Sequence, residues 1–160
     1  YRERRETVTI LRDSEGNALG VEERRVRELN MSGNTVRGRL DLIMSYLRQN
    51  YPTKLVVLMT PVHRAYATFG ASNIQYSELY ANSLGEFFED YVQAVRDAAD
   101  IWSAPLIDLY REGGLSPLTD ESAAAFYVNT ETDRLHLNPA GHRRIAGRIA
   151  GYRRRFEDII

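Results

Sequence analysis

Two short apolar runs, separated by a helical segment, most constrain how this chain can fold. The runs are "KLVVLMT" (Lys54–Thr60) and "APLIDLY" (Ala104–Tyr110), both rich in Val, Ile and Leu. Continuous runs of this kind are typical of strands covered on both faces. Residues 77–100 repeat apolar side chains at helical spacing. This order of strand, helix and strand predicts a βαβ unit and a parallel sheet. The side chains predicted to be buried on the helix are Leu84, Phe87, Phe88, Tyr91, Val95 and Ala98.

Three further elements are predicted outside this unit. Residues 6–29 hold two extended segments around a turn-rich stretch and predict a polar, exposed β-hairpin that is inserted into the domain. Residues 35–50 predict a helix that ends before Pro52, and residues 139–156 predict the last helix. The side chains predicted to face inward are Val36, Leu40, Ile43 and Leu47 on the first helix, and Ile145, Ile149, Tyr152 and Phe156 on the last.

A parallel sheet of only two strands would leave both edges uncovered and give its helices little surface to pack on. We therefore expect residues 1–160 to be the C-terminal part of a single domain, with an α/β core over residues 35–156. The remaining strands would come from an N-terminal segment or from a partner chain, such as a second copy of this protein. The first residue is Tyr1 rather than an initiator Met, in line with this expectation.

Composition excludes several classes of function. The sequence has no cysteine, which rules out disulfides, thiolate catalysis and cysteine metal sites. The net charge of −1 gives no long-range attraction to nucleic acid. No apolar run approaches the roughly 20 residues that a membrane-spanning helix needs, and no secretory leader is visible. We therefore expect neither a nucleic-acid partner nor a membrane span.

One short motif, "TETDRLHLNPAGHRRIA" (residues 130–146), suggests chemistry. Asp133 and His136 stand three residues apart in it, just ahead of the last predicted helix. At this spacing the carboxylate can accept a hydrogen bond from Nδ1 and leave Nε2 facing outward. That arrangement fixes the tautomer and stabilises the imidazolium formed when the ring takes a proton from a nucleophile. The alternative is structural: the Asp caps a turn and the His packs on the sheet edge. For a D-x-x-H motif taken by itself, this structural role is the more frequent one.

The longer string "DRLHLNPAGHRRIAGRIA" resembles the last conserved block of the SGNH (GDSL-type) hydrolases. In that family an Asp and a His three apart precede N-x-x-G-H, matched here by Asn138, Gly141 and His142, and then a terminal helix. "VVLMTPVHR" (Val56–Arg64) is similar to the family's strand that ends in T-P, and "APLIDLY" is similar to its next strand. The resemblance covers most of residues 35–156.

The resemblance implies a flavodoxin-like three-layer α/β/α sandwich with a parallel sheet, and a serine esterase or acyl hydrolase that needs no cofactor. It implies that Asp133 orients His136, and that His136 acts as general base and then as general acid. The implied substrate is a carboxylic ester, such as a short acyl group on a carbohydrate. The resemblance also points towards exported bacterial esterases, secreted or periplasmic.

The sequence departs from the family in one respect. The family's nucleophile lies in a "GDS" block near the N-terminus, and the Gly and "G-x-N-D" blocks that complete its oxyanion hole follow; none of the three is present. Ser14 lies in a polar turn, and Ser32 precedes a helix, where turn or capping roles are usual. We therefore expect the nucleophile upstream of this chain. A non-catalytic binding module is the alternative; a nucleotide-binding domain is disfavoured because no Gly-rich phosphate loop is present.

Three residues after the first apolar run are candidate substrate contacts. His63, Arg64 and Tyr66 follow a predicted strand at its carboxyl end, where open α/β sheets bind ligands. We expect them to line the pocket for the acyl or alcohol group; a solvated loop is the alternative. His142 is predicted to pack or cap on the last helix. A zinc site that joins it to the D-x-x-H pair matches no known ligand spacing, so no metal is expected.

Overall fold

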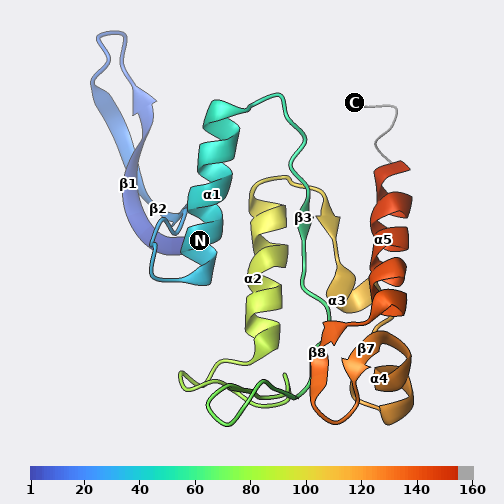
Figure 1. The fold of residues 1–160 in the computed structure, drawn as a ribbon. Coiled ribbons are helices and arrows are strands. Elements are labelled where there is room, and N and C mark those ends of the chain that lie inside the picture. Colours follow the sequence, from blue (N-terminus) through green and yellow to red (C-terminus); the bar gives the residue numbers. More distant parts are fainter. Residues whose placement is uncertain (155–160) are drawn as a thin grey trace. The chain divides into compact units, whose positions relative to one another are not determined.

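The computed structural model describes residues 1–154, which divide into two compact units between Pro52 and Thr53. Figure 1 shows the fold and labels most of the helices and strands of both units. No helix in the described part of the chain is long and apolar enough to cross a membrane.

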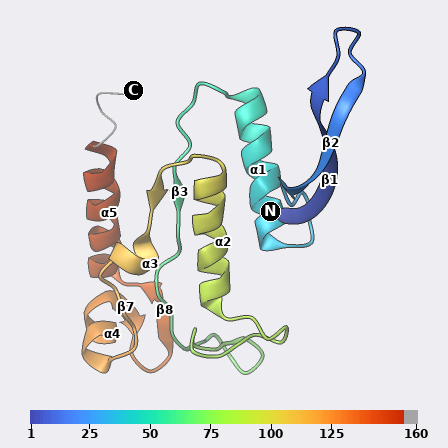
Figure 2. The ribbon, with the colours of Figure 1, turned by 180° about the vertical axis from the view of Figure 1, so that it is seen from behind.

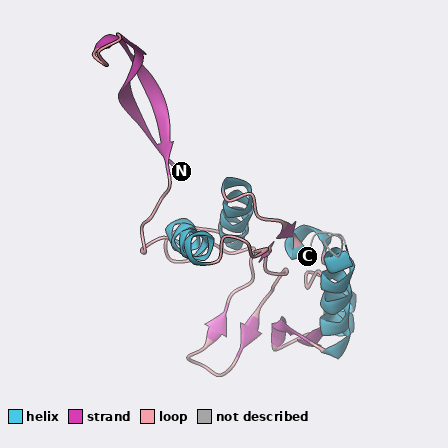
Figure 3. Cartoon of the chain, turned by 90° about the horizontal axis from the view of Figure 1, so that it is seen from above, coloured by secondary structure: helices cyan, strands magenta, loops and turns pink. Residues whose placement is uncertain are grey.

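The first unit contains a hairpin and one helix. Strands β1 (Arg2–Arg12) and β2 (Ala18–Glu28) pair antiparallel (Figure 3). Oppositely charged side chains face each other across the strands, as in the pair Glu3–Arg27 at 3.1 Å. Such exposed pairs favour the register but contribute little to stability, because water screens them.

Helix α1 (Val36–Asn50) begins at Thr35, whose hydroxyl accepts a hydrogen bond from the Gly38 backbone N–H at 3.0 Å. The prediction that Val36 and Ile43 face inward is wrong, because both side chains are exposed. The residues that α1 buries are Gly38, Asp41 and Met44. The buried face is therefore rotated away from the stripe that apolar spacing alone indicates.

The second unit contains a short βαβ element. Strands β3 (Leu58–Met59) and β6 (Leu106–Ile107) pair in parallel, and helix α2 (Phe88–Ile101) connects them and lies beside β3 (Figures 1 and 2). A buried polar network joins these elements. Asp108, at the end of β6, accepts hydrogen bonds from Thr60 Oγ1 at 3.1 Å and from Arg96 Nε of α2 at 2.9 Å. Burial alone would raise the pKa of Asp108, but these bonds outweigh burial and lower it.

The flavodoxin-like sandwich with a parallel sheet is wrong for this chain. Within residues 1–154 the parallel sheet has only β3 and β6, whereas the larger sheet is antiparallel in the order β5-β4-β8-β7. Its strands are β4 (Ala67–Thr68), β5 (Ile74–Gln75), β7 (Tyr127–Asn129) and β8 (Asp133–Leu137). The prediction that the first apolar run forms a strand covered on both faces is wrong, because Leu55, Val57 and Met59 are all exposed.

Helix α2 begins later than the sequence predicts, at Phe88 rather than near residue 77. Residues 82–87 form turns instead: Asn82 Oδ1 accepts the N–H groups of Leu84 and Glu86, and Gly85 has a positive φ of 81°. Leu84 and Phe87, predicted to be buried, are therefore exposed. The side chains that α2 buries are Val92, Ala94, Ala98 and Ala99, of which Ala98 was predicted.

Three helices complete the second unit, namely α3 (Leu109–Glu112), α4 (Asp120–Phe126) and α5 (Pro139–Arg153). Helix α5 follows β8 directly, so it anchors the strand that carries the D-x-x-H motif. On its predicted inward face Ile149 is exposed, and Phe156 lies outside the described residues.

Candidate active site

An irregularity in β8 brings Asp133 and His136 together. Tyr127 pairs with Leu137 and Asn129 pairs with Asp133, so β8 uses two more residues than β7 over the same distance. In this bulge Asp133 Oδ1 accepts the backbone N–H groups of Leu135 at 3.1 Å and of His136 at 2.9 Å. Bulges of this kind re-aim side chains and are frequent next to active sites.

The turn places the imidazole against the carboxylate. His136 Nδ1 lies 3.0 Å from Asp133 Oδ2. The Asp133 side chain is only 12% exposed, whereas that of His136 is 61% exposed. Burial alone would raise the pKa of Asp133; the hydrogen bonds from the His136 backbone, the His136 ring and the Leu135 backbone outweigh it and lower the pKa. An ionised carboxylate therefore faces Nδ1 and favours the tautomer that carries its proton there.

The other ring nitrogen is free for chemistry. Within residues 1–154, Nε2 of His136 has no hydrogen-bond partner. The Phe69 ring meets the imidazole edge to face, with centroids 5.4 Å apart, and limits its rotation. The pair can thus hold a proton acceptor at a fixed place on the surface.

The residues after His136 fix the strand to the last helix. Asn138 Oδ1 accepts the N–H groups of Ala140 and Gly141 at the start of α5, at 2.9 and 3.0 Å. Its Nδ2 donates to two carbonyls of the α4–β7 segment, at 3.1 Å each. A Cβ on Gly141 would lie 2.4 Å from the Phe126 carbonyl oxygen, so only glycine fits this contact. The N-x-x-G part of the motif therefore has a structural role.

The candidate substrate residues lie on the segment that borders β8. Ala65 N donates to Arg134 O at 2.9 Å, and Arg134 N donates to Tyr66 O at 3.0 Å. Tyr66 is exposed. Tyr66 is thus a backbone neighbour of the strand that carries Asp133 and His136.

His63 forms a second pair of a histidine with a carboxylate. Its Nδ1 lies 2.6 Å from Glu78 Oε1, and its ring stacks on Tyr110 with centroids 3.7 Å apart. The other Glu78 oxygen accepts the Arg64 backbone N–H at 3.0 Å. Glu78 was missed at the sequence level because residue 78 falls in the segment predicted to be helix. Neither His63 nor Arg64 hydrogen-bonds to Asp133 or His136.

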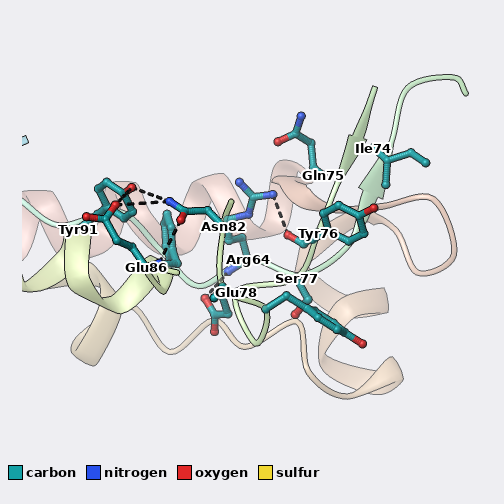
Figure 4. A pocket seen from close by; sticks show the side chains of 12 residues that line it. Arg64, Ile74, Gln75, Tyr76, Ser77, Glu78, Asn82, Glu86 and Tyr91 are labelled. Carbon is teal, nitrogen blue, oxygen red and sulfur yellow. Dashed lines mark hydrogen bonds between the residues drawn. The ribbon is translucent and has the colours of Figure 1, made fainter. Parts of the chain in front are cut away.

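Arg64 instead lines a cavity of about 230 Å³ (Figure 4). The cavity is bordered by β5 and by the segment that leads into α2. Its lining residues are Arg64, Ile74, Gln75, Tyr76, Ser77, Glu78, Tyr80, Ala81, Asn82, Glu86, Phe88 and Tyr91.

No group of three or more His, Asp or Glu residues that could hold a metal ion is present in residues 1–154. His142 is exposed on α5, and its backbone N–H donates to Asn138 O at 3.0 Å.

Comparison with known proteins gives structural likenesses only. No protein-family model and no curated protein matches the sequence. A crystal structure of a protein from Lactobacillus plantarum is similar over 84% of this chain and 59% of its own, with 27% identity and a TM-score of 0.67. A second crystal structure is similar over 79% of this chain and 55% of its own, with 30% identity and a TM-score of 0.66. This chain thus spans little more than half the length of these solved chains, and neither likeness brings an activity to it.

Proposed function

We propose that this chain carries the Asp–His part of a serine esterase of the SGNH (GDSL) type. The observation that carries the proposal is the 3.0 Å contact between Asp133 Oδ2 and His136 Nδ1, with the imidazole exposed. The substrate is a carboxylic ester, and acylated carbohydrates are the class we favour. Fold alone would not support this activity, so the proposal depends on the site.

The mechanism follows from the two ring nitrogens. A serine hydroxyl donates its hydrogen bond to Nε2 of His136, which takes the proton as Oγ attacks the ester carbonyl carbon. The imidazolium then gives that proton to the leaving alcohol, and the C–O bond breaks to leave an acyl-serine. A water molecule repeats both steps and releases the acid. Throughout, Asp133 stays ionised, holds Nδ1–H and stabilises the transient positive charge.

No serine among residues 1–154 hydrogen-bonds to Nε2 of His136. Ser32 has a turn role: its Oγ accepts the Asn34 backbone N–H at 3.3 Å. We propose that the nucleophile lies on a longer form of the chain or on a partner subunit. The greater length of the two similar solved chains is in keeping with this.

The test compares two histidines of the same block in the full-length protein. His136→Ala removes the base, and kcat/KM for a short-chain ester should fall by about 10³-fold or more. His142→Ala is the matched control, because His142 is exposed on α5; its activity should stay within about twofold of wild type. Labelling of one serine by a fluorophosphonate should be lost with His136→Ala only. Hydrolysis at the wild-type rate by His136→Ala would overturn the proposal.

A non-catalytic binding module is the second candidate. The lack of a described partner for Nε2 favours it, because an imidazole with nothing to activate does no chemistry. Full-length protein that binds a ligand yet never reacts with a fluorophosphonate would support this candidate over the esterase.

A further inference from the structure

We propose that the cavity beside β5 binds a neutral sugar ring of an acylated oligosaccharide whose ester is cleaved at His136. This inference rests on the proposed function for the reaction, but the cavity's ligand can be tested without it. At about 230 Å³ the cavity is smaller than the roughly 300–1,000 Å³ of drug-sized sites, so it suits one ring-sized group.

Aromatic side chains form one wall of the cavity. Tyr76 and Tyr80 are each 67% exposed, and their ring centroids lie 6.2 Å apart. Burial in a core therefore does not account for these two rings. Tyrosine presents an apolar face and a polar hydroxyl together, which suits it to the C–H surface and the hydroxyls of a sugar. Figure 4 shows Tyr76 beside the Arg64 side chain.

Hydrogen-bonding groups of both kinds line the rest of the cavity. Arg64 Nη2 donates to the Tyr76 carbonyl at 3.1 Å, whereas its Nε is buried without a partner in the described chain. Burial also lowers the pKa of this guanidinium. Asn82 Nδ2 donates to the Tyr91 hydroxyl at 2.8 Å, and the amide-bearing Gln75 is also a lining residue. Interleaved donors and acceptors match a ligand whose hydroxyls act as both.

Charge decides between a neutral ligand and an anion. Arg64 is the cation of the cavity lining, and Glu78 and Glu86 are two carboxylates beside it. Glu78 shares its oxygens with the His63 ring and the Arg64 backbone rather than the guanidinium. An anionic ligand such as a phosphate or a carboxylate would meet two carboxylates and one guanidinium in the cavity. The net repulsion is unfavourable in a partly desolvated site. A polyhydroxyl ligand meets no such penalty.

The larger sheet connects the cavity to the catalytic pair. Gln75 of β5 pairs with Ala67 of β4, and Ala67 pairs with Asp133 of β8. Two strand spacings separate Gln75 from Asp133, so their backbones lie about 10 Å apart. A sugar in the cavity and an ester at His136 can therefore belong to one short oligosaccharide.

Binding is tested with neutral trisaccharides that carry no ester, xylotriose and cellotriose, by titration calorimetry on the full-length protein. Tyr76→Ala should weaken binding about tenfold. Tyr46→Ala is the control, because Tyr46 on α1 is also an exposed tyrosine but is not one of the lining residues; it should bind as wild type does. No binding of either sugar, equal binding by Tyr76→Ala, or tight binding of inorganic phosphate in their place would overturn the proposal.

Kinetics separates this proposal from the proposed function. Tyr76→Ala should raise KM for acetylated xylotriose about tenfold more than it raises KM for ethyl acetate, because ethyl acetate has no sugar to fill the cavity. An esterase that depends on His136 but shows no such difference would keep the reaction and refute the sugar site. A protein that binds xylotriose through Tyr76 but hydrolyses no ester would keep the sugar site and refute the esterase.

Discussion

Replacement of Asp133 by Asn tests whether this carboxylate organises the candidate site. Asn keeps the shape and one oxygen, so the backbone N–H groups of Leu135 and His136 still have an acceptor. It loses the negative charge that makes both bonds charge-assisted, at 3.1 and 2.9 Å. It also turns an NH₂ group towards His136 Nδ1, where the wild type has a carboxylate oxygen at 3.0 Å.

The expected loss of stability follows from these three bonds. A hydrogen bond to a charged group contributes about 1.5–3 kcal/mol and one between neutral groups about 0.5–1.5 kcal/mol. Each backbone bond therefore loses about 1 kcal/mol. The ring bond adds little, since the His136 side chain is mostly exposed and water competes for it. Asp133→Asn should thus lower the free energy of unfolding by about 2 kcal/mol at neutral pH.

The pH dependence has a definite sign. The pKa of Asp133 is lowered from its ordinary value of 3.8, so the folded state favours the ionised form. The stability from this group is fully present above the unfolded pKa and is lost as pH falls through the lower, folded pKa. The difference between wild type and Asp133→Asn should be constant from pH 7 to about 5. It should then shrink as the pH falls from 3.8 through the lower pKa of the folded state, because the unfolded carboxylate takes up a proton before the folded one does.

Two assays report on this variant. Urea unfolding across the pH range measures the stability difference. Nitrogen NMR of the His136 ring reports the tautomer, which should change from Nδ1–H to Nε2–H as the Asn NH₂ donates to Nδ1. If the chain is an esterase, kcat should fall by about 10⁴-fold, the loss seen for the same change in another Ser-His-Asp enzyme. Equal stability at all pH values and an unchanged tautomer would refute the role assigned to Asp133.

Four further substitutions test the supporting structure by urea unfolding. Asn138→Ala should cost about 1–2 kcal/mol because α5 loses its N-cap; a change below a few tenths would contradict the cap. Gly141→Ala should destabilise the unit by about 1–3 kcal/mol through overpacking. Gly147→Ala, where a Cβ meets nothing within 4 Å, should stabilise the same helix by up to about 1 kcal/mol; similar effects at both positions would refute the close contact. Asp108→Ala should cost about 3 kcal/mol because Arg96 loses its buried partner, and an unchanged midpoint would show that the network is dispensable.

Local patterns in the sequence predict the hairpin and the helices better than the sheets. Helix α1 has a capping residue at Thr35 and an apolar period, both of which are local. Strands β4 and β5 have only two residues each, too few for an alternating pattern to appear. Their pairing depends on β8, more than 50 residues later, since Ala67 lies opposite Asp133. Tertiary context of this kind decides strand formation more than the residues themselves do.

The buried strands were mispredicted for a related physical reason. An apolar run shows that side chains favour burial, but it does not show that anything in the same chain covers them. Val57 and Met59 stay exposed although their sequence is typical of a central strand. The start of α2 was mispredicted because Leu84 and Phe87 fit the helical period, while the Asn82 turn and Gly85 fix a different backbone.

The Asp–His pair and the cavity also differ in how far apart in the sequence their residues lie. Asp133 and His136 bond to each other and Asp133 accepts the backbone N–H of His136, so the geometry of the candidate Asp–His pair can be inferred from their spacing. Asn138 and Gly141 also contact the earlier α4–β7 segment. The cavity is assembled differently: Arg64 and Tyr76 are twelve residues apart and meet only because β4 and β5 pair. Chemistry that rests on local geometry is therefore visible in the sequence, whereas the surface that selects a substrate emerges only with the fold. The sugar-site variants and the His136 variant consequently test independent parts of the molecule, and failure of one leaves the other standing.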